Sequence, residues 1–127
     1  MSTSPQYAAG PLLGAATIST ANTNRDGTGT MSTVLTAGAL GSLVDDIDIT
    51  AQGTTTAGMV RLFIHDGTTA RLWREVPVTP NTVSASNPAF FFRLTGLDLI
   101  LKNGTSLRAS TENAEAFNVN VSNGGDL

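Results

Sequence analysis

Several residue types are absent or rare in this sequence, and each gap excludes a class of protein. The 127 residues contain no cysteine, which excludes disulfides and thiolate metal sites, so stability must come from packing or assembly. Charged residues make up only 13% of the chain, about half the usual quarter. The net charge is −3 and no basic stripe is present, so nucleic-acid binding lacks its main source of affinity.

Long apolar runs are missing as well. No segment has the roughly 20 consecutive apolar residues of a membrane-spanning helix. Residues 1–10 have neither the basic start nor the apolar run of a secretory signal. No stretch repeats apolar residues at helical spacing over three turns. We therefore expect a protein that is made in a cytoplasm, does not enter a membrane and contains few helices.

Short alternating segments dominate what is present. Thr, Ser, Gly, Ala and Asn fill the space left by charged residues, which suits strands and tight turns. Period-two patterns and turn dipeptides such as Asp66-Gly67 and Asn103-Gly104 predict an all-β fold, an antiparallel β-sandwich or jelly roll of about eight short strands over residues 31–127. The predicted strands are 31–37, 43–50, 58–66, 71–78, 90–94, 97–101, 105–111 and 117–121. The predicted core residues are Leu62, Ile64, Phe90, Phe92, Leu99, Phe117 and Val119.

Residues 1–30 differ from the rest of the chain. They contain few large side chains, and these do not recur with a helical or strand period. We interpret this segment as an extended N-terminal arm with one short strand near residues 16–20, followed by a glycine-rich turn. Such an arm gains order by burying apolar anchors on a neighbouring subunit. The candidate anchors are Tyr7, Leu12, Leu13 and Ile18.

No residue pattern indicates catalysis, a metal site or a cofactor. His65 is the single histidine, and its neighbour Asp66 points to the opposite side of a strand, so the two do not form part of a triad readily. Asp45, Asp46 and Asp48 offer oxygen ligands for a cation, but they lie on a predicted strand and lack the spacing of a calcium loop. We expect a protein that is not an enzyme and holds no metal.

The arginines and the tryptophan are candidates for partner contact. Arg is favoured at protein interfaces because its planar fork pairs with carboxylates. Arg61 and Arg74 flank one predicted hairpin, and Trp73 beside Arg74 is the strongest single anchor for a partner. The alternatives are that the arginines only keep an outer face soluble and that Trp73 belongs to the core.

Four segments together resemble a group of small structural proteins of tailed bacteriophages and prophages. The segments are PQYAAGP, ISTANTNRDGTGT, TTTAGMVRLFIHDGTTARLWREVPV and LRASTENAEAFNV. The resemblance implies a β-sandwich virion protein and favours a decoration, or cement, protein on the head surface. It further implies binding to the major capsid protein, self-association as a homotrimer and an arm that reaches a neighbouring subunit.

Two other functions remain open at this level. A tail component such as a tube, terminator or baseplate-associated protein also uses β-sheets and arms, and residues 79–88 could form its long loop. Jelly rolls also serve as glycan- or receptor-binding modules, in which Trp73, His65 and the aspartates would line the site.

Overall fold

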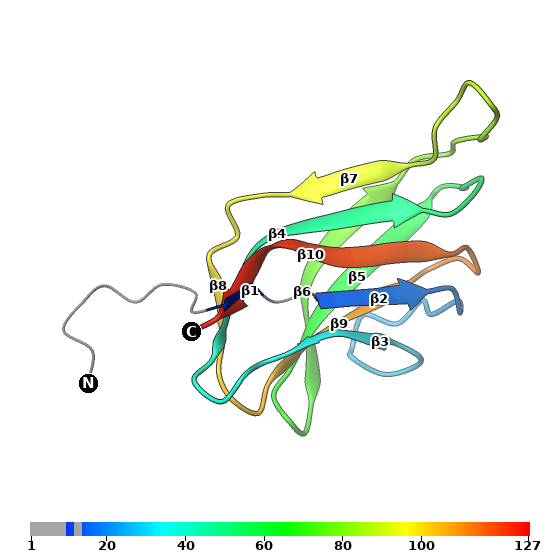
Figure 1. Cartoon of the computed structure of the whole chain (residues 1–127). Coiled ribbons are helices and arrows are strands. Elements are labelled where there is room, and N and C mark those ends of the chain that lie inside the picture. The colour runs from blue at the N-terminus through cyan, green and yellow to red at the C-terminus, as the bar shows by residue number, and fades with distance from the viewer. Residues whose placement is uncertain (1–9, 12–13) are drawn as a thin grey trace.

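The computed structural model describes residues 10–11 and 14–127, which form two antiparallel sheets and no helix. The two sheets face each other (Figure 1), so the prediction of an antiparallel β-sandwich is confirmed. Among these residues, none forms a helix that could cross a membrane. The strands are β1 Gly10–Pro11, β2 Gly14–Ile18, β3 Ser32–Thr36, β4 Ser42–Ala51, β5 Gly58–His65, β6 Ala70–Val78, β7 Phe91–Leu94, β8 Leu99–Leu101, β9 Ser106–Thr111 and β10 Phe117–Asp126.

The first sheet is built around the long strands β4 and β10. β1 and β2 pair with the outer side of β10, while β7 and β8 pair with the outer side of β4. A β-bulge interrupts the pairing of β4 with β10: Asn123 lies opposite Asp46 and Gly124 lies opposite Val44, which leaves Asp45 without a partner on β10. A Cβ atom on Gly124 would lie 2.3 Å from the Leu43 carbonyl oxygen, so glycine is required at this bulge.

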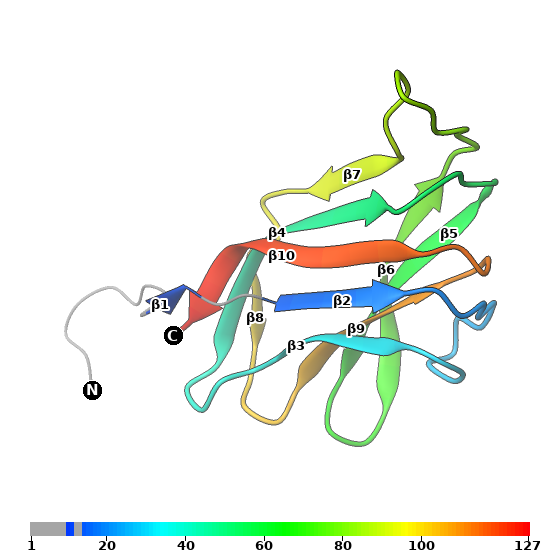
Figure 2. The same ribbon diagram turned by 45° about the vertical axis from the view of Figure 1, so that its right-hand side comes forward.

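The second sheet has the order β3-β9-β5-β6, and β5 lies in its interior. Val60 and Leu62 on β5 face the first sheet and are fully buried. Arg61 and Phe63 alternate with them and face the opposite way, yet they are fully buried too. The loop 19–31, which joins β2 to β3 (Figure 2), covers the outer face of β5 at Arg61: the Asn22 carbonyl oxygen accepts a hydrogen bond from Arg61, and Arg25 bonds Glu75 on β6.

The core lies between the two sheets. Of the predicted core residues, Leu62, Phe117 and Val119 are fully buried, and Ile64, Phe90 and Leu99 pack against them partly buried. The Phe90 and Phe117 rings meet edge to face with centroids 6.4 Å apart. The prediction for Phe92 is wrong: 39% of it is exposed, because β7 lies at the edge of its sheet.

Residues 14–30 are more integrated into the fold than an extended arm. β2 pairs with β10 over five residues, and Ile18 is 4% exposed within the core. Residues 14–18 therefore add a strand to the first sheet, while the predicted arm over residues 1–30 stays a prediction. Ile18 is a core residue because β10 has an open side that a further strand can fill. Tyr7, Leu12 and Leu13 lie outside the described residues.

Candidate functional site: an open sheet edge and a buried arginine network

The loop 19–31 joins β2 of the first sheet to β3 of the second and is held from within by Asn22. The Asn22 side chain is buried and donates hydrogen bonds to the carbonyl oxygens of Thr28 (3.1 Å) and Thr30 (2.8 Å). The Oδ1 atom of the same side chain accepts a hydrogen bond from the backbone amide of Asn24 at 3.0 Å. Gly27 and Gly29 take positive φ angles of 87° and 88°, which confirms the turn predicted there.

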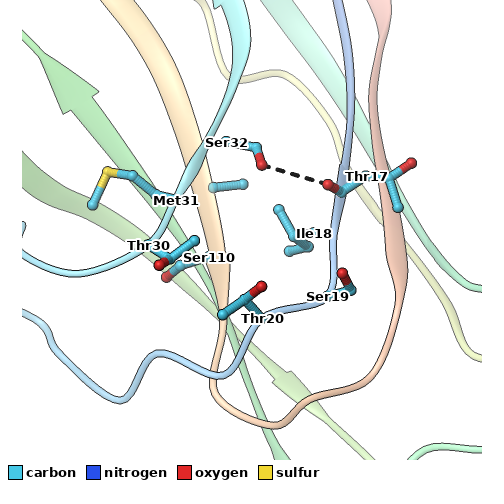
Figure 3. A pocket seen from close by; sticks show the side chains of 9 residues that line it. Thr17, Ile18, Ser19, Thr20, Thr30, Met31, Ser32 and Ser110 are labelled. Atoms are coloured by element: carbon cyan, nitrogen blue, oxygen red, sulfur yellow. Dashed lines mark hydrogen bonds between the residues drawn. The ribbon is translucent and has the colours of Figure 1, made fainter.

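A small cavity lies between the two limbs of this loop (Figure 3). It has a volume of about 60 Å³, its walls are residues 17–20 and 30–32, and its floor is Ala109 and Ser110 of β9. Hydroxyl groups dominate its lining, and the buried Ser110 Oγ has no hydrogen-bond partner among the described residues. The volume suits one or two water molecules and is far below that of a substrate pocket.

A second, larger hollow lies where the same loop meets the β5–β6 hairpin. Its volume is about 270 Å³, and its lining includes Asp26, His65, Thr68 and Arg108. His65 Nδ1 accepts a hydrogen bond from the Gly67 amide at 3.1 Å, so this nitrogen serves the turn. Asp26 accepts hydrogen bonds from the amide and hydroxyl of Thr28, and none of the hydrogen bonds among the described residues joins Asp26 to His65, so the hollow does not show the linked groups of a triad.

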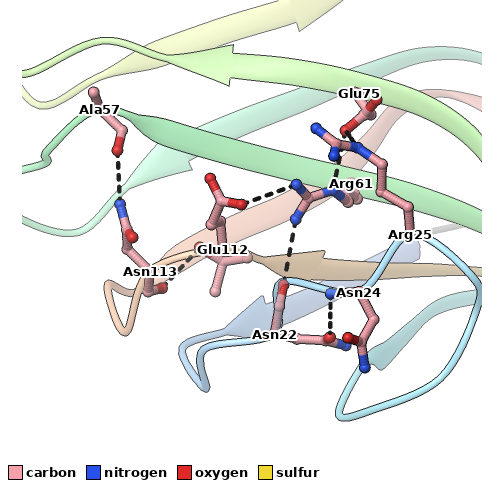
Figure 4. A network of polar contacts seen from close by, with 9 residues as sticks. Asn22, Asn24, Arg25, Ala57, Arg61, Glu75, Glu112 and Asn113 are labelled. Atoms are coloured by element: carbon pink, nitrogen blue, oxygen red, sulfur yellow. Dashed lines mark hydrogen bonds and ion pairs between the residues drawn. The ribbon is translucent and has the colours of Figure 1, made fainter.

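Arg61 occupies the centre of a polar network beneath the loop (Figure 4). Its guanidinium donates to Glu75 at 3.0 Å, to Glu112 at 3.0 Å and to the Asn22 carbonyl oxygen at 3.3 Å. Arg25, from the loop, donates to the same Glu75 carboxylate at 2.7 Å. The hydrogen bond from Arg25, followed by that from Arg61, lowers the pKa of Glu75 below its ordinary value.

This placement changes the interpretation of Arg61. The side chain is fully buried and all its contacts in the described chain are internal, so as folded it is not available to a partner. It links β5, β6, the end of β9 and the loop 19–31, and its role here is to hold the loop against the sheet. The sequence carries one sign of this: Arg61 interrupts the most apolar strand of the chain.

Trp73 and Arg74 lie on β6, the outer strand of the second sheet. A register shift opposite Leu62 and Phe63 leaves Trp73 as the extra residue of a bulge. The ring packs against the core with one side, and the exposed Arg74 guanidinium lies 4.6 Å from its centroid on the other. The interpretation of Trp73 as a core residue thus applies in part, and its role as a partner anchor stays a prediction.

The three aspartates of β4 do not converge. Asp45 accepts from the Asp98 amide at 3.2 Å, and Asp46 accepts from the Gly96 amide at 3.2 Å. Asp48 accepts two hydrogen bonds from Arg93, at 2.6 and 3.0 Å, and these lower the pKa of Asp48. Within residues 10–11 and 14–127, no three His, Cys, Asp or Glu side chains are grouped to hold a metal ion.

Asp66 caps the hairpin that follows β5. Its carboxylate accepts from the amides of Thr69 (2.8 Å) and Thr68 (2.9 Å) and from Arg71 (2.6 Å). The Thr69 amide, then Arg71 and the Thr68 amide, hold the pKa of Asp66 far below its usual range. Asp66 therefore stabilises the turn that the dipeptide Asp66-Gly67 predicted.

The largest exposed apolar side chains gather along one side of the first sheet. Phe91 and Phe92 of β7 are 53% and 39% exposed, and Ile100 of β8 is 59% exposed. Leu40, in the turn before β4, is 81% exposed. Phe91 lies opposite Thr50 and Ile100 lies opposite Leu43, near the two ends of β4, so these side chains form two separate exposed groups along one edge of the sheet. Large apolar side chains at such an edge gain most when another protein covers them. Sequence analysis missed it because alternation assigned Phe92 to the core.

Comparisons with known proteins give one distant likeness. No family model and no curated protein matches the chain. One similar solved structure is a pentameric capsid protein from metagenomic phage sequences, with 14% sequence identity and a TM-score of 0.38. The likeness covers 91% of this chain, which spans 66% of the length of that protein. A likeness this distant assigns neither a family nor a role to this chain.

Proposed function

We propose that this protein is a structural component of a tailed-phage virion. The observation that carries the proposal is the β7–β8 side of the first sheet, where Phe91, Phe92 and Ile100 are exposed and no further strand pairs among the described residues. Apolar and aromatic groups at a sheet edge gain most when another polypeptide covers them. The low charge content and the resemblance of four segments to phage structural proteins support the same role.

Within this class we propose a decoration protein that binds the major capsid protein on the outer surface of the head. Its durability would come from packing and from subunit contacts, since the chain has no disulfide. The homotrimer expected from the resemblance remains a prediction.

Binding to undecorated heads tests this function. We expect purified protein to co-sediment with heads that lack it, with saturation at a fixed ratio to capsid subunits. The double variant Leu40→Lys/Ile100→Lys should bind at least about tenfold more weakly, because it places charge in a desolvated contact. Ala114→Lys is the matched control, since Ala114 is exposed in the turn between β9 and β10 and should leave binding unchanged.

Two outcomes would overturn the decoration proposal. The first is no binding to heads at any concentration at which the protein remains soluble. The second is binding confined to tails, visible by electron microscopy of labelled virions, which would assign the protein to the tail instead.

A further inference from the structure

The free side of β7 presents a defined set of backbone groups. The Ala51 amide donates to the Phe90 carbonyl oxygen at 2.8 Å, and Phe92 lies opposite Ile49 in the same ladder. Because hydrogen-bonded pairs alternate along an antiparallel ladder, Phe90, Phe92 and Leu94 direct their backbone groups to β4. The N–H and C=O groups of Phe91 and Arg93 therefore point away from β4, to the side where the described sheet has no further strand.

The side chains of β7 divide between the two faces of the sheet. Phe91 and Arg93 lie opposite Thr50 and Asp48 on the outer face, and the Arg93 guanidinium lies 5.7 Å from the Phe91 ring centroid. Phe92 lies opposite the core residue Ile49 and faces the rim of the sandwich. All three are exposed at this edge.

A self-complementary register about Phe92 satisfies both facts. When two copies of β7 pair antiparallel about a twofold axis at Phe92, the free groups of Phe91 in one copy meet those of Arg93 in the other. Directly opposite residues share a face, so each Arg93 also lies beside the Phe91 ring of the other copy, a favourable cation–π pair. The two Phe92 side chains meet on the other face. A twofold axis at Arg93 would instead place two arginines opposite each other.

We propose that β7 is a self-association site, and that its occupant is a second copy of this chain paired about Phe92. The partner is the same chain because hydrogen-bond parity, the face of each side chain and the Arg–aromatic complementarity all agree for this pairing. Because the contact uses the same strand from both copies, it is closed and does not extend into a fibre. Pro88 and Gly96 bound the strand and limit the pairing to β7.

The proposal concerns the same edge as the proposed function and adds the partner to it. It assigns β7 to a second copy and leaves the β8 end, with Ile100 and Leu40, for the capsid shell. The twofold contact does not depend on head binding, so each can be tested alone.

Single cysteines report the register, since the natural chain contains none. At a non-hydrogen-bonded pair the Cβ atoms approach to about 4.5–5.5 Å, within reach of a disulfide after small adjustment. Phe92→Cys should therefore form a covalent dimer under mild oxidation, seen as twice the 13.1 kDa chain mass on non-reducing gels. Phe91→Cys is the matched control, because its sulfur would lie roughly 7 Å or more from its twin. Random collision would favour the more exposed Phe91 position instead.

A charge pair tests the contact between Phe91 and Arg93 of the two copies. Phe91→Glu places a carboxylate opposite Arg93 and should retain association within about threefold of the unchanged protein. Phe91→Arg places like charges opposite each other at two symmetric positions and should weaken association by at least about tenfold. Sedimentation equilibrium measures both variants, and thermal unfolding confirms that both remain folded.

The results separate the possibilities. Crosslinking at Phe92 with loss of association in Phe91→Arg alone supports the pairing. Equal weakening by both charges would reduce the site to a non-specific apolar patch and overturn the register. A protein that stays monomeric at high concentration, with no crosslink at Phe92, would overturn the self-association site. Head binding measured on the same samples would still decide the proposed function by itself.

Discussion

The strands β5 and β7 both carry an arginine that pairs with a carboxylate, but one arginine is buried and the other is exposed. Arg61 on β5 has a fully buried side chain bonded to two glutamates, whereas the Arg93 side chain on β7 is 52% exposed and bonded to Asp48 alone. β5 has a strand on both sides and a cover on each face. β7 has one neighbour and an open edge. Position in the sheet, rather than strand sequence, decides whether the arginine side chain is buried or exposed to solvent.

The difference has an energetic side. A buried guanidinium without its counter-charges is costly because its desolvation is no longer offset. An exposed ion pair exchanges protein contacts for water at little net cost. β5 should therefore be among the most stable parts of the chain and β7 among the most easily opened. The following changes test this contrast in order of decreasing effect.

Removing both acids from Arg61 should have the largest effect. The double variant Glu75→Ala/Glu112→Ala leaves a buried guanidinium with only the Asn22 carbonyl oxygen, and we expect a loss of about 3–5 kcal/mol in the free energy of unfolding. Urea denaturation followed by circular dichroism measures it. Adding Arg61→Met to the same background should restore part of that loss, because the buried charge is then gone. A triple variant less stable than the double would contradict the network as described.

Detaching the loop 19–31 should come next. Gly27 has a φ of 87°, and a Cβ atom there would lie 2.1 Å from the Ala70 carbonyl oxygen on β6. Gly27→Ala should cost about 2–3 kcal/mol, since left-handed strain and a backbone clash add together. Gly104→Ala is the matched control: its φ is 89° with open space around it, and it should cost only about 1 kcal/mol. Equal losses at the two glycines would show that the loop is not seated on β6.

Acid should destabilise the hairpin beside β5. The pKa of Asp66 is lowered in the folded protein, so the stability it contributes is present above its unfolded-state pKa of about 4 and is lost as the pH falls below it. Glu75 and Asp48 act in the same direction. We expect the urea concentration at the unfolding midpoint to decrease as the pH is lowered from about 5 to about 3. Asp66→Ser should make this decrease smaller. An unchanged pH dependence in Asp66→Ser would exclude Asp66 as a main source.

Breaking the exposed pair on β7 should have the smallest effect. Asp48→Asn removes the carboxylate that Arg93 holds, and we expect a loss of about 1 kcal/mol or less, declining further in high salt. The same urea titration at low and high ionic strength measures it. A loss of unfolding free energy as large as that caused by removing the acids of Arg61 would contradict the distinction drawn between β5 and β7.

Much of the local structure follows from sequence because it depends on neighbours in the chain. Alternation predicted β5 and β6 to within one residue at each end, and Asp66-Gly67 predicted the turn between them. Asn103-Gly104 likewise marks the turn before β9, where Gly104 has a φ of 89°. These features need only side-chain period and the conformational freedom of glycine.

Other features depend on which strands become neighbours. Period two places Phe90 and Phe92 on one face, but only the sheet order leaves Phe92 at a rim while Phe90 packs on Phe117. The sequence predicts a short strand near residues 16–20, but only the open side of β10 decides that residues 14–18 pair there as β2. The alternation of apolar and polar residues predicts neither outcome, because each depends on a strand that is distant in the sequence.

The sequence by itself determined the fold class, the absence of disulfides, the main hairpin turns and the poverty of charge. Tertiary structure alone decided which arginine is buried, because the Glu112 that pairs with Arg61 lies 51 residues away and the Asn22 carbonyl lies 39 residues away. It also decided which aromatic side chains reach the solvent. Local propensity acts through nearest neighbours, whereas burial depends on the arrangement of the whole chain.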